Sequence, residues 1–532
     1  MQIIRLPYSQ VPQLSLKDKA YASADARLRP FYAHDMTIAG FEQAIAERLK
    51  HPTDRSLLVD ELRKQYAGLP DSELVLQNVN SLSDPHTFTV TTAHQPSLFT
   101  GPLYYIYKII STIHLARQLK AAYPSYHFVP VFINSGEDHD FEEVNHTHVY
   151  GKKLIWESGE SGSVGMMKTH TIRAVLDELQ GILGASGHAA ELFKLFEESY
   201  TRHDRYSDAT TYLVHGLFKA YGLVVLDPNK PALKRAFIPY IQRELLERPS
   251  KALVDQTAAA LEAAGFSGQA HAREINFFYL GDQSRERIVF ENGHYNVLNT
   301  DLTFTEEAIL AELQAHPERF SPNVIMRPIF QELILPNLAY VGGGGELAYW
   351  LERKSQFELF GLPFPVLVRR NSVLWLDKNS AQRLEKLGLQ VTDLFEDTEM
   401  LIKRYVAAQS ETELNLEAEK SQLLSLFESI RQKAQQIDPT LPAAVMAEHA
   451  KQLKVVEQLE GRLVRAEKQR HDTAIQQIRN LREKFFPGNG LQERHDNFSA
   501  YYAKYGNSFF DTLLLHLDPL QRDFLVMTEM GV

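Results

Sequence analysis

The segment 134-NSGEDHDFEEVNH-146 concentrates side chains that could do chemistry. Glu137, Asp138, His139 and Asp140 are consecutive and directly follow the apolar run 128–134. At the end of a buried strand, such groups could hold a substrate ammonium, ligate Mg²⁺ or accept a proton as general base. A helix start also favours acidic residues, but capping does not need four ionisable groups. We therefore expect this cluster to be catalytic.

The residues after this cluster are expected to begin a helix. Two sets of side chains would then each share a helix face: Asp138, Glu142 and Asn145, and His139, Glu143 and His146. The first set adds Asn145 to the substrate-binding candidates. The second is an alternative zinc site, although its spacing differs from the HExxH pattern.

A second polar motif, 93-AHQPSLFTGPLYY-105, follows the β-branched run 87–93. His94 and Gln95 are expected at the strand end, and Thr100-Gly101 at the start of the next helix, where backbone N–H groups favour an anion. Lys108 lies about two turns further along that helix. We assign this motif and Tyr104 to substrate binding and count His94 among the catalytic candidates. The alternative is an ordinary turn in which His94 and Gln95 cap backbone groups.

A glycine run, Gly342 to Gly345, separates a predicted strand from a predicted helix. Glycine lets a ligand approach the backbone closely, although the run is neither a Walker A loop nor a GxGxxG fingerprint. We assign Gly343, Gly344 and Glu346 to substrate binding.

Further candidates flank the glycine run. Arg327 precedes a proline, where an extended backbone is expected, and its guanidinium could bind a carboxylate or phosphate bidentately; a simple ion pair is the alternative. Glu332 and Tyr349 join the substrate-binding group, although core packing is the plainer interpretation of Tyr349. Arg369 and Asn371 close the last predicted core strand, where cationic groups could meet a triphosphate.

The order of the elements predicts an α/β fold with a parallel sheet. Strands are expected at 87–93, 128–134, 222–227, 338–341 and 364–369, with long helices at 101–123 and 345–360. Strand–helix–strand alternation is typical of βαβ units. Ligands bind beyond the carboxyl ends of such strands, which is where the polar motifs lie.

Other segments surround this core. Short helices are expected over 1–85, and amphipathic helices over 151–221 and 231–265. The runs 275–280, 285–290 and 294–299 resemble an antiparallel meander. The predicted core therefore covers 1–375, with insertions at about 151–221 and 228–330.

Residues 376–485 are charged and almost free of glycine, and they predict a coiled-coil hairpin. Leu416, Leu423, Ile430 and Ile437 recur every seven residues before the turn 439-PTLP-442. After the turn, apolar positions keep steps near three and four, which indicates an antiparallel hairpin or half of a dimer bundle. The aromatic segment 486–532 is expected to dock on the core.

Composition narrows the classes of function. The 532 residues carry a net charge of −11, are 44% hydrophobic and include no cysteine. The negative charge argues against a nucleic-acid partner. The absence of cysteine excludes disulfides, thiolate zinc sites and a cysteine nucleophile. No apolar run resembles a signal peptide or spans a bilayer, so we expect a soluble cytoplasmic protein with no membrane partner.

Taken together, the motifs resemble the BshC family, the cysteine ligases of bacillithiol biosynthesis. The resemblance rests on HQPSLFTGPLY, FINSGEDHDFEEVNH, SPNVIMRPIFQELILPNLAYVGGGGELAYW, the helical hairpin and QERHDNFSAYYAKYG, in this order over essentially the whole chain. It implies a Rossmann-like core with connective-peptide insertions, as in class I aminoacyl-tRNA synthetases. It also implies a C-terminal α-helical coiled coil that forms a homodimer.

The resemblance implies a ligase that joins cysteine to the amino group of glucosaminyl-malate, giving bacillithiol. ATP or ADP is the expected nucleotide, in a pocket apart from the core crevice, and Mg²⁺ held by Asp140 and Glu137 is a candidate ion. The expected general base is Asp138 or His139, and Lys108 and Arg327 would hold carboxylates or phosphates. We assign nucleotide binding to Arg369, Asn371, Asn497, Tyr501, Tyr505 and Gly506, the last four from the family pattern.

Two other functions stay open at this point. The chain could be another ATP-dependent amino-acid ligase or adenylating enzyme with a class I synthetase-like fold. It could also be a non-catalytic coiled-coil scaffold with a degenerate Rossmann domain. Four ionisable groups at one strand end argue against the scaffold.

Overall fold

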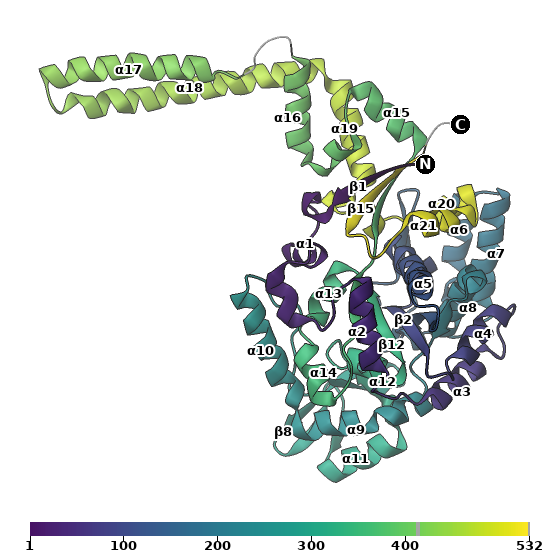
Figure 1. The fold of residues 1–532 in the computed structure, drawn as a ribbon. Helices are drawn as coiled ribbons and strands as arrows, with labels where there is room; N and C mark the ends of the chain where they lie inside the picture. Colours follow the sequence, from purple (N-terminus) through teal and green to yellow (C-terminus); the bar gives the residue numbers. More distant parts are fainter. Residues whose placement is uncertain (411–414, 530–532) are drawn as a thin grey trace. The chain divides into compact units, whose positions relative to one another are not determined.

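The computed structural model describes residues 1–410 and 415–529, which divide into two compact units (Figure 1). The larger unit comprises Ile3–Leu374 and Gln492–Met527. The smaller comprises Met1–Gln2, the described residues of Trp375–Leu491, and Thr528 with Glu529. No helix among the described residues is long and apolar enough to cross a membrane.

A five-stranded parallel sheet forms the centre of the larger unit. Its order is β13-β12-β2-β3-β6, with β2 Thr87–His94, β3 His127–Asn134, β6 Val224–Leu226, β12 Asn337–Gly342 and β13 Val366–Arg369. The strands are almost entirely buried, as expected when helices cover both faces of a parallel sheet. Strands β2 and β3 pair in register up to His94 with Asn134. The two polar motifs that follow these strands therefore leave the sheet at the same edge.

Side chains alternate between the two faces of this sheet, as the period of two requires. On one face Phe88, Phe128 and Val341 pack with residues of α2 (Ile38–Arg48) and α5 (Tyr104–Ala122). On the other, Val131 and Leu367 pack with residues of α3 (Arg55–Tyr66), α9 (Pro231–Glu247) and α12 (Arg327–Ile334). The unit has a Rossmann-like α/β fold, as the sequence predicted.

Two insertions interrupt the sheet. Between β3 and β6 lie an antiparallel hairpin and three helices: β4 His146–Val149, β5 Lys152–Ile155, α6 Arg173–Leu183, α7 Gly187–Thr201 and α8 Tyr206–Phe218. Between β6 and β12 lie α9, α10 (Pro249–Ala263), α11 (Glu306–Ala315), α12 and an antiparallel sheet of order β10-β9-β8-β7-β11. Its strands are β7 Phe277–Gly281, β8 Ser284–Glu291, β9 His294–Val297, β10 Thr303–Phe304 and β11 Phe320–Pro322. The predicted meander is thus confirmed and is extended by two strands.

The remaining elements of the larger unit lie at its two chain ends and after β12. They are α1 Leu16–Ala22, α4 Glu73–Ser81, α13 Gly344–Trp350, α14 Lys354–Phe360, α20 Ser499–Tyr505 and α21 Ser508–His516. A further sheet has the order β1-β15-β14, with β1 Gln2–Pro7, β15 Asp523–Thr528 and β14 Ser372–Leu376.

A long antiparallel helical hairpin dominates the smaller unit. It consists of α17 (Glu417–Ile437) and α18 (Leu441–Arg470), which the Lys420–Glu460 ion pair joins at 2.8 Å. Three shorter helices complete the unit: α15 Lys378–Leu387, α16 Thr398–Gln409 and α19 Asp472–Phe485. The predicted hairpin therefore occupies 417–470 of the expected 376–485.

Three local predictions were wrong. Residues 135–145 form turns and not a helix, because other backbone partners capture their peptide groups: Gly165 N donates to Gly136 O at 2.7 Å and Val164 N donates to Asp138 O at 2.6 Å. The helix expected from Gly101 begins at Tyr104, since Thr100 and Gly101 have φ values of 72° and 63°. Arg327 is not extended but is the first residue of α12.

Candidate active site

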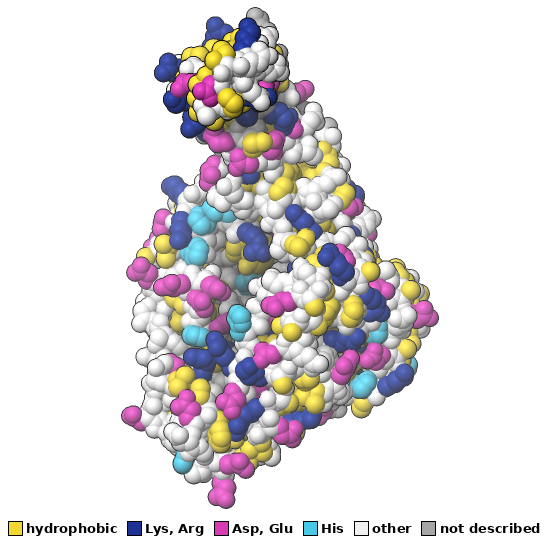
Figure 2. Space-filling model, turned by 90° about the vertical axis from the view of Figure 1, so that its left-hand side faces the viewer, with side chains coloured by type: hydrophobic (Ala, Val, Ile, Leu, Met, Phe, Trp, Pro, Cys, Tyr) yellow, Lys and Arg dark blue, Asp and Glu magenta, His cyan; other side chains and the backbone are white. Residues whose placement is uncertain are grey.

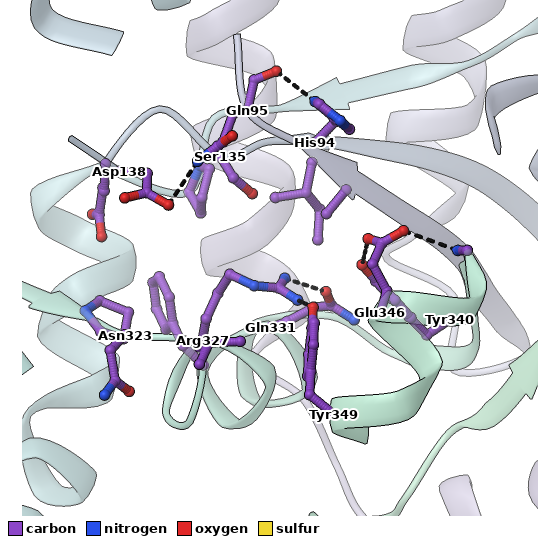
Figure 3. A pocket seen from close by; sticks show the side chains of 18 of the residues that line it. His94, Gln95, Ser135, Asp138, Asn323, Arg327, Gln331, Tyr340, Glu346 and Tyr349 are labelled. Carbon is purple, nitrogen blue, oxygen red and sulfur yellow. Dashed lines mark hydrogen bonds between the residues drawn. The ribbon is translucent and has the colours of Figure 1, made fainter. Parts of the chain in front are cut away.

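A pocket of about 570 Å³ lies at the carboxyl ends of β2, β3 and β12. Of the residues predicted for the site, nine line it: His94, Gln95, Tyr104, Glu137, Asp138, Arg327, Gly343, Glu346 and Tyr349. Figure 3 shows Asp138 and Gln95 on one side of the pocket and Arg327, Gln331 and Tyr349 on the other. The strand ends thus bring together three motifs that lie far apart in the sequence.

Asp138 is held as a carboxylate. Gln95 Nε2 donates to its Oδ2 at 2.6 Å, and His139 N and Arg285 donate to its Oδ1 at 2.8 and 3.3 Å. Burial acts to raise the pKa of Asp138, but the neighbouring His139 and Arg285 outweigh it and hold this pKa well below its usual range. A carboxylate with a low pKa is a weak general base and a good partner for an ammonium group.

Glu137 is the second carboxylate on this wall. Its Oε1 lies 2.5 Å from Lys234 Nζ, and its Oε2 accepts a hydrogen bond from Ser321 at 3.0 Å. Lys234 is fully buried, and burial lowers its pKa while Glu137 acts in the opposite direction. Because a buried lysine already neutralises Glu137, we infer that it shapes the wall of the pocket and does not bind a second cation.

His94 is neutral and orients Tyr104. Its Nδ1 contacts the Gln95 carbonyl at 2.9 Å and must donate there, so its Nε2 accepts from the Tyr104 hydroxyl at 3.0 Å. Burial, with the nearby Lys108, lowers the pKa of His94 to about 4. With both ring nitrogens engaged, His94 has no free lone pair for proton transfer.

Lys108 lies beneath the pocket and does not face it. Its buried Nζ donates to Glu346 Oε1 at 2.8 Å and to the Ala93 carbonyl. Glu346 also accepts from Tyr340 at 2.7 Å and from Gly343 N at 2.9 Å. Burial would raise the pKa of Glu346, but the Lys108 charge and these hydrogen bonds lower it to about 2. This ion pair fixes the turn from β12 into α13.

Arg327 supplies a guanidinium on the opposite wall. It donates to the Tyr349 hydroxyl at 2.8 Å and to Gln331 Oε1 at 3.2 Å. No carboxylate forms an ion pair with it among residues 1–410 and 415–529, so its charge is available to a bound anion. Gln331 is in turn held through Glu332, which is fully buried and does not line the pocket.

Three other arginines that line the pocket were not predicted as site residues: Arg285, Arg370 and Arg494. Arg370 makes a bidentate ion pair with Glu493 at 2.8 and 3.0 Å, and Arg494 lies with its guanidinium carbon 5.8 Å from the centre of the Tyr104 ring. Arg285, in β8, was also missed because it looks like an ordinary strand residue. The one available signal was the pair of adjacent cations Arg369-Arg370 at the end of β13.

Other predicted residues lie outside the pocket and have structural contacts. Gly101 O accepts from Thr147 and Asn497, a Cβ on Gly344 would lie 2.1 Å from Asp18 Cγ, and the Asn145 carbonyl accepts from Trp156 N. The residues outside it are Thr100, Gly101, Lys108, His139, Asp140, Asn145, Glu332 and Gly344.

The residues expected to bind a nucleotide lie outside this pocket, and their nucleotide-binding role stays a prediction. Arg369 forms a buried bidentate pair with Asp18 at 2.7 and 2.9 Å, and Asn371 donates to the Asp518 carbonyl at 2.8 Å. Asn497 donates to the Phe99 and Gly101 carbonyls at 2.8 and 2.6 Å. The Tyr501 hydroxyl donates a hydrogen bond to Asp496. Tyr505 is the last residue of α20, and Gly506 caps that helix. Asn371 and Asn497 thus join the C-terminal segment to the core, and Arg369 joins α1 to β13.

The ligand sets considered for a metal also do not fit. Asp140 is exposed outside the pocket, and Glu137 is paired with Lys234. The zinc alternative required a helix over 139–146, and that helix does not form. Within the described part of the chain, no three His, Cys, Asp or Glu side chains are grouped so that they could hold a metal ion.

Comparisons with known proteins agree with the resemblance of the motifs. The family model described as "Bacillithiol biosynthesis BshC, N-terminal Rossmann-like domain" matches residues 1–371, and "Bacillithiol biosynthesis BshC, C-terminal coiled-coil domain" matches 373–529. Proteins named "Putative cysteine ligase BshC" from Flavobacterium johnsoniae and Flavobacterium psychrophilum are 43% and 41% identical, over 96% and 95% of this chain and 96% of each relative. A structure titled as a putative arginyl tRNA synthetase from Campylobacter jejuni covers 85% of this chain and 97% of its own, at 11% identity. Its TM-score of 0.21 is too low to carry an argument.

Proposed function

Because the chain belongs to the BshC family of bacillithiol biosynthesis, we propose that it is a ligase that joins cysteine to the amino group of glucosaminyl-malate. One observation carries the proposal: a single pocket holds the ionised Asp138 on one wall and the guanidinium of Arg327 on the other. The Asp138 carboxylate can bind the ammonium form of the amine, and the Arg327 guanidinium can bind the carboxylate of the acid. Holding both partners in one pocket turns a bimolecular reaction into one between oriented groups.

Amide formation requires a neutral amine and an activated carboxyl group. The amine nitrogen attacks the carbonyl carbon, a C–N bond forms, and the activating group leaves with the electron pair of its bond to that carbon. Starting from the ammonium, two protons must leave the nitrogen: the first frees its lone pair before the attack, and the second leaves as the amide forms, to the departing group or to water. Glu143 is the better base, because it lines the pocket and burial, with the charges of Asp140 and Asp138, raises its pKa. Asp138 then holds and orients the ammonium before Glu143 removes the first of these protons.

We further propose that ATP with Mg²⁺ activates the cysteine carboxyl group. Amide formation from a free carboxylate is otherwise uphill in free energy.

The same proposal includes a cytoplasmic homodimer formed through the α17–α18 hairpin. Its support is a set of apolar side chains that this hairpin exposes: Leu424, Leu426, Ile430, Ile437, Leu441, Val455, Leu459 and Leu463. Exposed apolar positions at coiled-coil spacing are typical of a helix surface that a second copy covers.

The test is a competition among substrates. The protein is incubated with an equimolar mixture of amino acids and glucosaminyl-malate, with and without ATP, and the products are identified by mass spectrometry. We expect an ATP-dependent cysteinyl amide as the main product. A different aminoacyl amide would favour another amino-acid ligase. If nothing forms, and no substrate raises the melting temperature, the scaffold function is favoured.

A further inference from the structure

A second pocket, of about 310 Å³, adjoins the core pocket, and Asn323 lines both. Its wall is built from strands β7 and β8, the loop before β7 and one residue from the acidic motif. The lining residues are His139, His271, Arg273, Ile275, Phe277, Phe278, Arg287 and Asn323. Figure 2 shows a hollowed face of the molecule on which His, Lys or Arg, and Asp or Glu side chains all lie around the hollow.

The register of the antiparallel sheet explains why two arginines face these neighbouring pockets. Arg285 and Arg287 are two residues apart on β8 and therefore point to the same side. Phe278 pairs with Arg287 across the strands, and its ring lies 3.9 Å from the Arg285 guanidinium carbon. On this face Arg285 reaches Asp138 in the core pocket, while Arg287 lines the second pocket.

The second pocket carries positive charge without a carboxylate to balance it. Among the described residues, none that lines it is acidic. The acids adjacent in sequence have other partners: Glu274 pairs with Arg248 at 2.9 Å, and Glu286 accepts from Asn299 at 2.8 Å. Arg273 and Arg287 therefore face the pocket as uncompensated cations, in a chain whose net charge is −11.

His139 adds a donor on the boundary between the two pockets. Arg285 donates to its Nδ1 at 2.9 Å, and since a guanidinium only donates, Nδ1 accepts. With Nδ1 as an acceptor, the ring proton is on Nε2. The ring rests on Phe278, with centroids 5.6 Å apart. The Asp138 carboxylate therefore lines the core pocket, and the His139 imidazole lines the second pocket, where it can donate a hydrogen bond.

We propose that the second pocket binds the carboxylate groups of the ligand whose ammonium lies on Asp138. The ligand class is an amine that also carries carboxylates, and Arg273, Arg287, His139 and His271 are its anion-binding residues. This inference rests on the proposed function, in which that ligand is glucosaminyl-malate with its malyl dicarboxylate. Arg273 and Arg287 can each bind one of the two malyl carboxylates. Asn323 lines both pockets and would contact the part of the ligand between them.

Calorimetric binding to the full-length protein tests the assignment directly, with L-malate as one probe and inorganic phosphate as the other. The variant R273Q/R287Q removes both charges, and R462Q on α18 is the control that removes an exposed arginine elsewhere. We expect the variant to bind L-malate at least tenfold more weakly than wild type, because charge-assisted hydrogen bonds are lost, and R462Q to match wild type. Equal malate affinity in wild type and R273Q/R287Q overturns the inference, as does a loss confined to phosphate.

Kinetics separate this inference from the proposed function. If ligation occurs, R273Q/R287Q should raise KM for glucosaminyl-malate by about tenfold or more with kcat little changed, and should not alter the affinity for glucosamine, which lacks the carboxylates. An unchanged KM rejects the pocket while ligation stands. If no product forms with any amine, the ligase proposal fails, and malate calorimetry still decides whether the pocket binds carboxylates.

Discussion

The Lys108–Glu346 ion pair allows an estimate of how much one carboxylate contributes to the free energy of unfolding. The substitution Glu346→Gln keeps the size of the side chain and removes its charge. It leaves the Lys108 ammonium, which is 1% exposed, without a counter-ion, because an amide oxygen can still accept a hydrogen bond but carries no charge. Removing one partner of a buried pair costs roughly 3–5 kcal/mol.

The pKa of Glu346 gives an independent magnitude. Lys108 and the hydrogen bonds lower it to about 2 from an ordinary 4.5, and each unit corresponds to about 1.4 kcal/mol, so the carboxylate stabilises the fold by about 3 kcal/mol at neutral pH. Because the folded-state pKa is the lower one, this stability is fully present above about pH 5 and is lost as the pH falls toward 2. The two routes agree on a loss near 3 kcal/mol for E346Q.

Urea unfolding at pH 7 and at pH 4 measures this. We expect E346Q to lower the free energy of unfolding by about 3 kcal/mol at pH 7 and by less at pH 4. The double variant K108M/E346Q should lose less than the sum of the two single variants, because no unpaired charge remains. A loss below about 1 kcal/mol for E346Q at pH 7, or additive losses, would refute the reasoning.

Three further predictions concern the site and the hairpin. Arg327→Met should raise KM for the substrate whose acid it binds by about tenfold with the fold intact by circular dichroism, since a charge-assisted pair is lost; an unchanged KM for both substrates would remove Arg327 from the site. Glu143→Gln should abolish the rise of kcat with pH on the acidic side, because the group whose raised pKa governs that rise is gone; the same rise in E143Q and wild type would exclude Glu143 as the base. Leu459→Glu with Leu463→Glu should convert a dimer to a monomer in analytical ultracentrifugation, because two side chains that are 47% and 46% exposed would become charged at the contact; a stable dimer would place the interface elsewhere.

The sequence predicted the parallel core well, because its signal is local. The β-branched run before His94 and the apolar run before Asn134 could only be buried strands, and both are. Polar residues directly after such strands had to meet at one edge of the sheet, and Gln95 with Asp138 does so.

The partners of these residues could not be predicted, because they depend on long-range register. Arg285 lies 147 residues from Asp138 in the sequence, and only the pairing of β7 with β8 turns it toward that carboxylate. The partner of Lys108 could not be predicted either, and helical spacing alone predicted that this side chain faces the crevice. Its side chain lies beneath the pocket because Glu346, 238 residues away, is its counter-ion.

The acidic motif shows why a helix prediction can fail. Its acidic residues suit a helix start, but residues 163–165 of the first insertion take up the backbone groups of Gly136 and Asp138. That contact is invisible in the local sequence. As a result Asp138 and His139 point to different pockets, and Asp140 faces solvent.

The rate of cysteinyl amide formation by Asp138→Asn, measured beside Asp140→Asn, tests the central claim most directly. Both variants remove one acid from the same motif, but only Asp138 lines the core pocket. D138N should lower kcat/KM for glucosaminyl-malate by roughly tenfold to a hundredfold, the value of one charge-assisted contact, while D140N stays near wild type. Equal rates for D138N and wild type, or equal losses in both variants, would contradict the assignment of this pocket as the place where the amine is held.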